Sequence, residues 1–263
     1  MFAQERQQSI AEKIKAEGRV RVAQLAAEFA VTEDCIRKDL TVLEKQGLAR
    51  KTYGGAVRVR ENPHLYSSRD RRGLPDPERL GIVQKAMSLI HADDLVYLDV
   101  SNTSLELAEA IARSGLRVTV MTNMIAVLNL LSSAPAVTVL FPGGQMNPER
   151  DGFWGSMSQQ AVRSFRMDLA FLGTVGIDAE NGTLSTYQID DGMMKQAVIA
   201  QSRRVYVYAE LHKFQQEGSC VYARLQEVTG LILGGRPEAA LARQLAASGV
   251  ETLWEEDHEH AED

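Results

Sequence analysis

Residues 22–55 read VAQLAAEFAVTEDCIRKDLTVLEKQGLARKTYGG, and this stretch decides the fold expected for the N-terminal part of the chain. Apolar residues recur at helical spacing over Val22–Phe29 and again over Ile36–Leu43, which predicts two helices. Thr32 stands just before the second helix, where its hydroxyl can accept a hydrogen bond from a helix amide. An extended run, Leu48–Tyr53, then ends in two glycines, which is a hairpin signal. The stretch therefore predicts a helix, a tight turn, a second helix and a two-stranded wing.

The outer face of the second predicted helix carries basic and short polar side chains. A helix with an apolar inner face and such an outer face, preceded by a short helix and a turn, fits the major groove of DNA. Basic and aromatic side chains on the wing would meet phosphates. An ordinary helical hairpin with a solvated charged face is the alternative. The residues that we expect to contact DNA are Thr32, Glu33, Asp34, Cys35, Arg37, Lys38, Arg50, Lys51 and Tyr53.

The charge of the chain is divided unevenly along its length. The sequence has 263 residues and a formal net charge of −6. Residues 1–60 contain 12 Lys and Arg against 8 Asp and Glu, whereas the remaining residues contain 17 against 27. A basic N-terminal part on an acidic body favours local attraction of DNA. The length fits one small domain and a second of about 200 residues.

Cysteine content and hydropathy indicate where the protein resides. Cys35 and Cys220 are too few for a disulfide framework and show no metal-binding spacing, so we expect a reducing cytoplasm and no metal. No apolar run reaches the roughly 18–20 residues that span a bilayer, and Met1–Arg6 is no signal peptide. We therefore expect a cytoplasmic protein without membrane contact. Cys35 is interpreted as a plain small side chain, with a redox switch at the DNA surface as the alternative.

Apolar strands alternate with helical patterns after the N-terminal part, which predicts an α/β fold with a mostly parallel sheet and helices on both faces. We expect a winged helix-turn-helix domain at 1–60, a linker at 61–77, an α/β effector-binding domain at 78–254 and an acidic tail at 255–263. A linking helix is expected at Glu78–Ile90. The predicted strands are Leu95–Asp99, Val118–Met121, Val137–Phe141, Leu169–Leu172, Val205–Tyr208 and Leu231–Leu233. The predicted helices between and after them are Leu105–Ala112, Ile125–Leu131, Gln159–Phe165, Met193–Gln201 and Glu238–Ala247.

Polar residues follow several of the predicted strands, where ligands of parallel α/β sheets bind. Asp99–Ser104 places hydroxyl and amide side chains at a helix N-terminus, which can cradle an anion. Lys195 follows Asp191 by one helical turn and is a candidate cation for a phosphate. Capping roles are the alternative for each loop. The candidate ligand residues in these loops are Asp99, Ser101, Asn102, Thr103, Ser104, Thr122, Asn123, Gly143, Gly144, Thr174, Asp191 and Lys195.

The N-terminal stretch resembles the DNA-binding region of the DeoR family of bacterial transcriptional regulators. That region typically reads Val-Ser-x-x-Thr-Ile-Arg-Arg-Asp-Leu, and residues 31–40 of this chain read VTEDCIRKDL. The family's Leu-Glu-x-x-Gly and Gly-Gly-Ala segments have counterparts at residues 43–47 and 54–56. The chain departs from the family at Cys35, where Thr is frequent. This departure bears on the target DNA sequence and not on DNA binding.

The resemblance covers about residues 3–235 and implies a C-terminal sugar-phosphate sensor whose fold is similar to ribose-phosphate isomerase. It adds Glu210 and Lys213 to the candidate effector-binding residues, through the family segment Asp-x-x-Lys-Phe at residues 210–214. The other matching segments are residues 99–103 for Asp-x-Gly-[Ser/Thr]-Thr, 122–123 for Thr-Asn, 143–144 for Gly-Gly, 176–178 for Gly-Ile-Asp and 191–195 for Glu-x-x-x-Lys.

The departures from the family cluster among the expected effector contacts. Ser101 and Asn102 replace Gly and Ser or Thr, Asp191 shortens a Glu, and Glu210 lengthens an Asp. A Cβ at position 101 is expected to block a backbone conformation that only Gly adopts easily. We therefore expect an unusual phosphorylated sugar or sugar acid, or a phosphate that sits differently.

The resemblance implies a DNA-binding regulator, and we expect a repressor of a carbohydrate uptake or catabolism operon that responds to a phosphorylated sugar or sugar acid. An activator is the alternative, because that choice depends on the operator position. A sugar-phosphate isomerase using Asp99, Asp191, Lys195 and Glu210 is a further alternative. We expect no enzyme activity, since the family consists of sensors without catalysis. The expected partners are an operator duplex, the phosphorylated carbohydrate as effector in place of any cofactor, and further copies of the chain in a dimer or tetramer.

Overall fold

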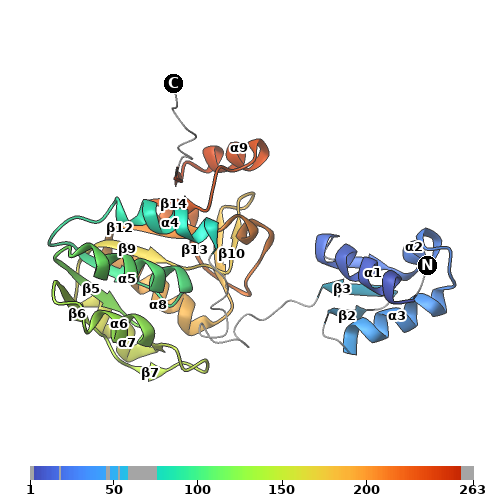
Figure 1. Ribbon diagram of the computed structural model, residues 1–263, viewed down its shortest axis with the longest axis horizontal. Helices are drawn as coiled ribbons and strands as arrows, with labels where there is room; N and C mark the ends of the chain where they lie inside the picture. Colours follow the sequence, from blue (N-terminus) through green and yellow to red (C-terminus); the bar gives the residue numbers. More distant parts are fainter. Residues whose placement is uncertain (1–2, 18, 46–47, 53, 59–75, 256–263) are drawn as a thin grey trace. The chain divides into compact units, whose positions relative to one another are not determined.

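The computed structural model describes residues 3–17, 19–45, 48–52, 54–58 and 76–255. The chain divides into two compact units, Met1–Asn62 and Pro63–Asp263, which are described separately (Figure 1). Several expectations fall outside the described residues: the contact from Tyr53, most of the predicted linker, and the tail beyond Glu255.

The first unit is a winged helix-turn-helix built on a small apolar core. Ile10 and Ile14 of the first helix pack with Leu25 of the second and with Ile36 and Leu40 of the third, and all five side chains are buried. The helical spacing read from the sequence therefore marks the faces that meet. The elements are α1 (Ala3–Glu17), β1 (Arg19–Arg21), α2 (Val22–Glu28), α3 (Glu33–Lys45), β2 (Ala49–Thr52) and β3 (Gly55–Arg58).

The wing has three strands, so the prediction of a two-stranded wing was wrong. β3 lies between β1 and β2 and pairs antiparallel with both. The third strand is β1, in which Val20 pairs with Ala56. A three-residue strand is too short to show a recognisable alternation of apolar and polar residues. Its pairing partner also lies far along the chain, so no local hairpin signal marks it.

The second unit is built on a parallel sheet of seven strands in the order β15-β14-β12-β9-β4-β5-β6. All the predicted strands belong to this sheet, as expected from apolar runs buried on both faces. The sequence did not reveal β15. The strands are β4 (Leu95–Leu98), β5 (Val118–Thr122), β6 (Val137–Leu140), β9 (Met167–Leu172), β12 (Ser202–Ala209), β14 (Gly230–Leu233) and β15 (Glu251–Leu253).

Helices cover both faces of the seven-stranded sheet, as predicted. Buried side chains of α4, α5 and α6 pack on one face and those of α7, α8 and α9 on the other, in two separate apolar clusters. No helix among the described residues is long and apolar enough to cross a bilayer. The helices are α4 (Pro77–Met87), α5 (Asn102–Ser114), α6 (Ile125–Leu131), α7 (Ser156–Arg163), α8 (Ile189–Gln201) and α9 (Ala239–Ser248).

Helix α4 begins inside the predicted linker and ends three residues before the predicted Ile90. Asp76 caps it by accepting a hydrogen bond from the Glu78 amide at 3.0 Å, and Pro77 takes the first helical position, which suits proline. A smaller antiparallel sheet follows β9, and no pattern in the sequence predicted it. The remaining elements are β7 (Gln145–Met146), β8 (Phe153–Trp154), β10 (Gly176–Asp178), β11 (Thr183–Thr186), β13 (Cys220–Arg224) and two 3-10 turns, η2 (Leu211–Gln215) and η3 (Leu225–Glu227).

Candidate functional site

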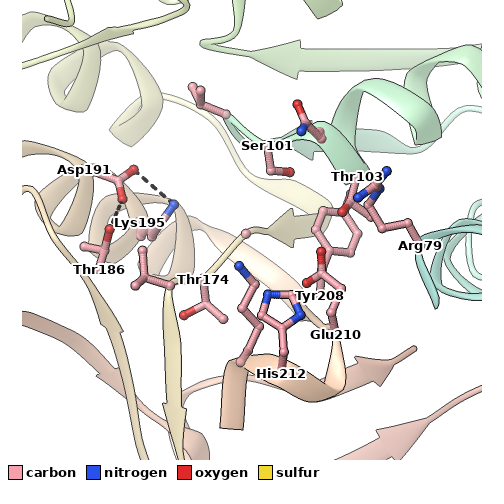
Figure 2. Close-up of a pocket in the computed structure, with 15 residues that line it drawn as sticks. Arg79, Ser101, Thr103, Thr174, Thr186, Asp191, Lys195, Tyr208, Glu210 and His212 are labelled. Carbon is pink, nitrogen blue, oxygen red and sulfur yellow. Dashed lines mark hydrogen bonds and ion pairs between the residues drawn. The ribbon is translucent and has the colours of Figure 1, made fainter. Parts of the chain in front are cut away.

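A polar cavity of about 240 Å³ lies at the carboxyl ends of β4, β9 and β12, which are neighbours in the sheet (Figure 2). The loops that follow these strands supply much of its wall, and α4, α8, the first turn of α5 and the end of β11 also contribute. This is the edge of a parallel sheet at which ligands bind. The lining residues are Arg79, Val100, Ser101, Asn102, Thr103, Gly173, Thr174, Val175, Thr186, Asp191, Lys195, Tyr208, Glu210, His212 and Lys213.

Lys195 is held between two carboxylates at the inner end of the cavity. Its side chain is only 4% exposed, and its ammonium lies 3.0 Å from Asp191 Oδ1 and donates a short hydrogen bond to Asp99 Oδ2. Asp191 also accepts a hydrogen bond from Thr186 Oγ1 at 2.6 Å, and Figure 2 shows both of its contacts. Asp99 itself lies behind the cavity wall, where the Gly173 amide donates to it at 3.1 Å. We call Asp99, Asp191 and Lys195 the lysine triad.

The side chain of Lys195 stays protonated within the lysine triad. Burial by itself lowers the pKa of Lys195, but the charges of Asp191 and Asp99 outweigh burial and raise that pKa well above its ordinary value. Burial raises the pKa of the Asp99 carboxyl, and the Lys195 ammonium opposes this change. Among the described residues, Asp99 Oδ1 is buried without a hydrogen-bond partner. The triad therefore combines one ammonium with two carboxyl groups, so Lys195 offers no surplus positive charge.

The N-terminus of α5 forms a second part of the cavity wall. Ser101 caps this helix: its Oγ accepts from the Ser104 amide at 3.0 Å and donates to Ser104 Oγ at 2.9 Å. Ser101 has φ −155° and ψ 158°, an extended conformation open to any residue, so the expected backbone conflict at this position is absent. Thr103 lies in the first turn and lines the cavity. The amides of this turn supply the positive end of the helix dipole.

Charged residues surround the mouth of the cavity. Glu210 precedes η2, which carries His212 and Lys213. Arg79 of α4 reaches the same cavity and pairs with Asp76 at 3.2 Å and Glu106 at 2.9 Å. Partial burial, and then the charge of Lys213, lower the pKa of His212 below its ordinary value, so the imidazole is neutral at pH 7. The mouth therefore offers both cations and a carboxylate to a polar ligand.

Helix α3 presents the candidate DNA-contact face. Thr32 Oγ1 accepts from the Cys35 amide at 3.3 Å, which is the cap expected from the sequence. Arg37 pairs with Glu33 at 2.5 Å and with Asp34 at 2.7 Å along the exposed surface. Lys38 is also exposed. The face thus carries one lysine beside an arginine whose charge is balanced within its own helix.

Cys35 has a different environment from its neighbours on α3. Its Sγ is half-buried and accepts from Arg6 Nη2 at 3.1 Å. Arg6 Nε in turn pairs with the buried Asp39 at 2.7 Å, and Gln7 donates to the same carboxylate at 2.8 Å. Cys35 therefore joins α3 to α1 and is only partly exposed.

The wing approaches α3 through Lys51. Its amide donates to Glu44 Oε1 at 2.9 Å and its ammonium donates to Thr41 Oγ1 at 2.9 Å. Arg50 lies in β2, but the structure describes only its backbone. The structure thus shows how Lys51 is held against α3, whereas the side chain of Arg50 and all of Tyr53 lie outside the described part of the chain. The DNA contacts expected of the wing stay a prediction.

Two family models match most of the chain. A DeoR-like helix-turn-helix domain matches residues 6–62, and a DeoR C terminal sensor domain matches residues 76–234. The chain belongs to the DeoR family of DNA-binding transcriptional regulators. It is 31% identical to the HTH-type transcriptional repressor GlcR of Bacillus subtilis (strain 168), over 98% of this chain and 99% of that protein.

Two further likenesses are more distant. The glycerol-3-phosphate regulon repressor of Escherichia coli (strain K12) is 26% identical over 92% of this chain and 94% of its own length. Among solved structures, ribose 5-phosphate isomerase A of Methanocaldococcus jannaschii has a TM-score of 0.38 and 14% identity, covering 52% of this chain and 53% of that one.

The sensor domain of this DeoR-family chain gathers eight of the predicted effector residues around one cavity: Ser101, Asn102, Thr103, Thr174, Asp191, Lys195, Glu210 and Lys213. Asp99 and Ser104 lie directly behind the wall, where they hold Lys195 and Ser101. Segments from several strand ends thus meet as the resemblance implied. Their role in binding remains a proposal.

Thr122, Asn123, Gly143 and Gly144 do not line the cavity. Asn123 accepts from the Tyr97 hydroxyl at 2.9 Å and donates to the Phe153 carbonyl at 2.9 Å. A Cβ on Gly144 would lie 2.0 Å from Ser158 Oγ, because Ser158 of α7 packs directly against the Gly144 backbone. These residues therefore brace the loops beyond β5 and β6.

Sequence reasoning missed Arg79, Thr186 and Tyr208 as cavity residues. Arg79 lies in α4, the helix that comes before the first strand of the sheet, and no local sequence signal connects it to the strand ends. Thr186 ends a strand of the unpredicted antiparallel sheet. His212 also lines the cavity. It lies two residues after Glu210, in the segment that follows a predicted strand, and this position could have identified it from the sequence.

Proposed function

We propose that this DeoR-family regulator represses an operon for carbohydrate uptake or catabolism, and that a phosphorylated sugar or sugar acid bound in the sensor cavity sets its affinity for the operator. The observation that carries the effector class is the composition of the cavity wall. A helix N-terminus and Lys213 suit a phosphate, while Asp191 and Glu210 suit sugar hydroxyls. Arg79 also lines the cavity, but its charge is balanced by Asp76 and Glu106.

The charge distribution favours one orientation of the effector. A phosphate beside Lys195 would face Asp191 and Asp99 as well, and the lysine is already shared between these two carboxyl groups. A hydroxyl can donate to Asp191 at that end without such repulsion. We therefore place the hydroxyls at the lysine triad and the phosphate at the α5 N-terminus near Lys213. This replaces the expectation that Lys195 supplies the cation for the phosphate.

The names of the relatives support the proposed repression. One is named a glycerol-3-phosphate regulon repressor and another a transcriptional repressor. Repression itself is tested by deleting the gene and measuring transcripts of the adjacent operon, which should rise. A fall in those transcripts would assign the protein as an activator instead.

Operator recognition is assigned to the outer face of α3 and to the wing. In the full-length protein, Arg37→Ala with Lys38→Ala should lose at least ten-fold in affinity for a duplex selected by the parent from a random library, because both a positioning and a base-reading cation are removed. The measurement is fluorescence anisotropy. Arg163→Ala with Arg166→Ala removes the same charge from the sensor unit and serves as the matched control. Unchanged affinity in the α3 variant would mean that the assigned face is wrong.

The effector class is tested with a panel of sugar phosphates, phosphorylated sugar acids and their unphosphorylated parents. A ligand at 100 times its dissociation constant adds about 2.7 kcal/mol of stability, which a thermal-shift assay detects readily. We expect shifts only with phosphorylated compounds, and a matching change in operator affinity. A shift with free sugars alone would overturn the phosphate assignment.

The proposed role of the cavity is binding without turnover. Each compound that binds is incubated with the protein and assayed for aldose–ketose interconversion. Interconversion that Glu210→Gln abolishes would replace the sensor proposal by an isomerase.

The proposed divisions are a DNA-binding domain at 1–60, a linker at 61–77, a sensor at 78–254 and a tail, in an assembly of two or four copies.

A further inference from the structure

Helix α8 has two faces of opposite character. Asp191 and Lys195 lie one turn apart on its buried face and belong to the lysine triad. Ile189 and Met193 also lie one turn apart, but they are 69% and 47% exposed. The two pairs are offset by two residues, or about 200° around a helix, so they point in opposite directions. Gln196 and Ala200 continue this stripe, and none of its four residues carries a charge, although the exposed Asp190 lies beside the stripe in the first turn; we call the four uncharged residues the α8 outer face.

Strand β13 extends the α8 outer face. Gln196, Ile199 and Ala200 line one groove of about 450 Å³ together with Val221–Arg224. Val221 is 57% exposed, which is unusual for a β-branched apolar side chain on a strand. β13 is also the edge strand of its sheet among the described residues. An uncovered apolar edge of this kind invites a partner.

We infer that the α8 outer face with Val221 contacts the same surface of a second copy of this chain, across a two-fold axis. Such an interface brings a surface against itself, so a stripe without charge meets no repulsion. Arg224 and Glu227 border the groove with opposite charges, and the Glu227 carboxylate accepts a hydrogen bond from the Arg224 amide of its own chain at 2.7 Å. In the inferred two-fold contact, the Arg224 guanidinium of one copy would approach Glu227 of the other. The described part of each chain contains one recognition helix, α3, and reading two half-sites requires a second copy.

This surface gives the effector a route to the assembly. The lysine triad and the α8 outer face belong to one rigid helix, so a ligand that shifts Asp191 and Lys195 also shifts Ile189 and Met193. The protomers then change their relative orientation, and with it the spacing of their recognition helices. This coupling rests on the proposed effector site, whereas the contact between copies does not.

The test is Met193→Glu combined with Val221→Glu in the full-length protein, followed by sedimentation velocity over a range of concentrations. Each copy would bring two added carboxylates into an interface made by the same surface of both chains, so burial and like-charge repulsion should raise the dissociation constant of the assembly at least 100-fold. Leu80→Glu is the matched control: Leu80 is 59% exposed on α4, which covers the opposite face of the sheet. The control should assemble like the parent.

Three results would overturn the inference. These are a parent that stays monomeric, a double variant that assembles like the parent, or a control that dissociates to the same degree as the double variant. Circular dichroism establishes that each variant is folded. Thermal shifts with the phosphorylated compounds are measured on the same samples. If no compound binds the parent, the proposed effector fails while the contact between copies is judged independently by sedimentation.

Discussion

Lys195 determines the character of the sensor cavity more than any other residue. Its place one turn after Asp191 made it a candidate phosphate ligand in the sequence. The fold brings Asp99 to it from a strand end 96 residues away, and this second carboxylate changes its role. Lys195 becomes the centre of a buried ion network that joins α8 to the loop after β4. Its charge stabilises the wall of the cavity and holds Asp191, which lines that cavity.

Replacing Lys195 by Met should destabilise the sensor domain by about 3–5 kcal/mol at pH 8, because two buried carboxyl groups lose their cation. In the parent, the raised pKa of Lys195 contributes stability that is constant below its unfolded pKa of about 10.4 and is lost only as pH rises beyond it. In the variant, one carboxyl must take a proton to fold. The folded state then binds more protons than the unfolded state, so stability should rise as pH falls from about 8 to 5.

Urea unfolding at several pH values measures both effects. Lys85→Met removes a positive charge from α4 without touching the lysine triad and should keep the parent's pH profile. A Lys195→Met protein with the parent's stability and no new slope between these pH values would contradict the ion network described here.

At the scale of the element, the wing shows how close backbone approach specifies a strand pair. A Cβ on Gly55 would lie 2.0 Å from the Val20 carbonyl oxygen, at the point where β3 joins β1. The neighbouring Gly54 has φ +81°, but a Cβ added to it would meet no atom within 4 Å. The two glycines thus serve different purposes, one providing space and the other a left-handed turn.

Gly55→Ala should open the wing at a cost of about 1–3 kcal/mol, because β1 and β3 must move apart. Amides of Arg19–Arg21 and Gly55–Arg58 should then exchange with deuterium faster, and operator affinity should fall. Gly54→Asn is the comparison, since asparagine tolerates a left-handed conformation and meets no atom there. Equal protection in both variants, measured by hydrogen exchange and mass spectrometry, would show that the close approach does not hold the wing.

Across the whole molecule, charge is separated by function. Residues 1–60 carry a surplus of Lys and Arg, while the remainder carries 27 acidic against 17 basic residues. Attraction to DNA is thereby confined to the unit that reads it, and the acidic remainder disfavours nonspecific wrapping by the rest of the chain. The net charge of −6 by itself would have argued against a DNA-binding protein.

The confinement of charge predicts the salt dependence of operator binding. Lys38→Gln should weaken binding to all duplexes by a similar factor and reduce the slope of log affinity against log salt by about 1, as expected for one lost phosphate contact. Anisotropy between about 50 and 200 mM salt measures the slope. Arg163→Gln, on the sensor unit, should leave it unchanged. A Lys38→Gln slope equal to that of the parent would remove Lys38 from the interface.

The sequence by itself determined the elements whose signal is local. Helical spacing and the Thr32 cap identified α2 and α3, and apolar runs identified most strands of the parallel sheet, because burial imposes its pattern on every such segment. Loops after neighbouring strands were expected at one edge, and Ser101, Thr174 and Glu210 do line one cavity there. This convergence follows from the parallel arrangement, because the carboxyl ends of parallel strands lie at the same edge of the sheet.

Only the tertiary structure decided which distant groups touch. β1 is too short to carry a pattern and exists because β3 lies beside it. Arg79 enters the cavity from a helix that precedes the sheet, and Asp99 turns Lys195 from a free cation into part of the lysine triad. Pairings between residues far apart leave no periodicity in either segment. They depend on how the elements pack, and packing is a property of the whole domain.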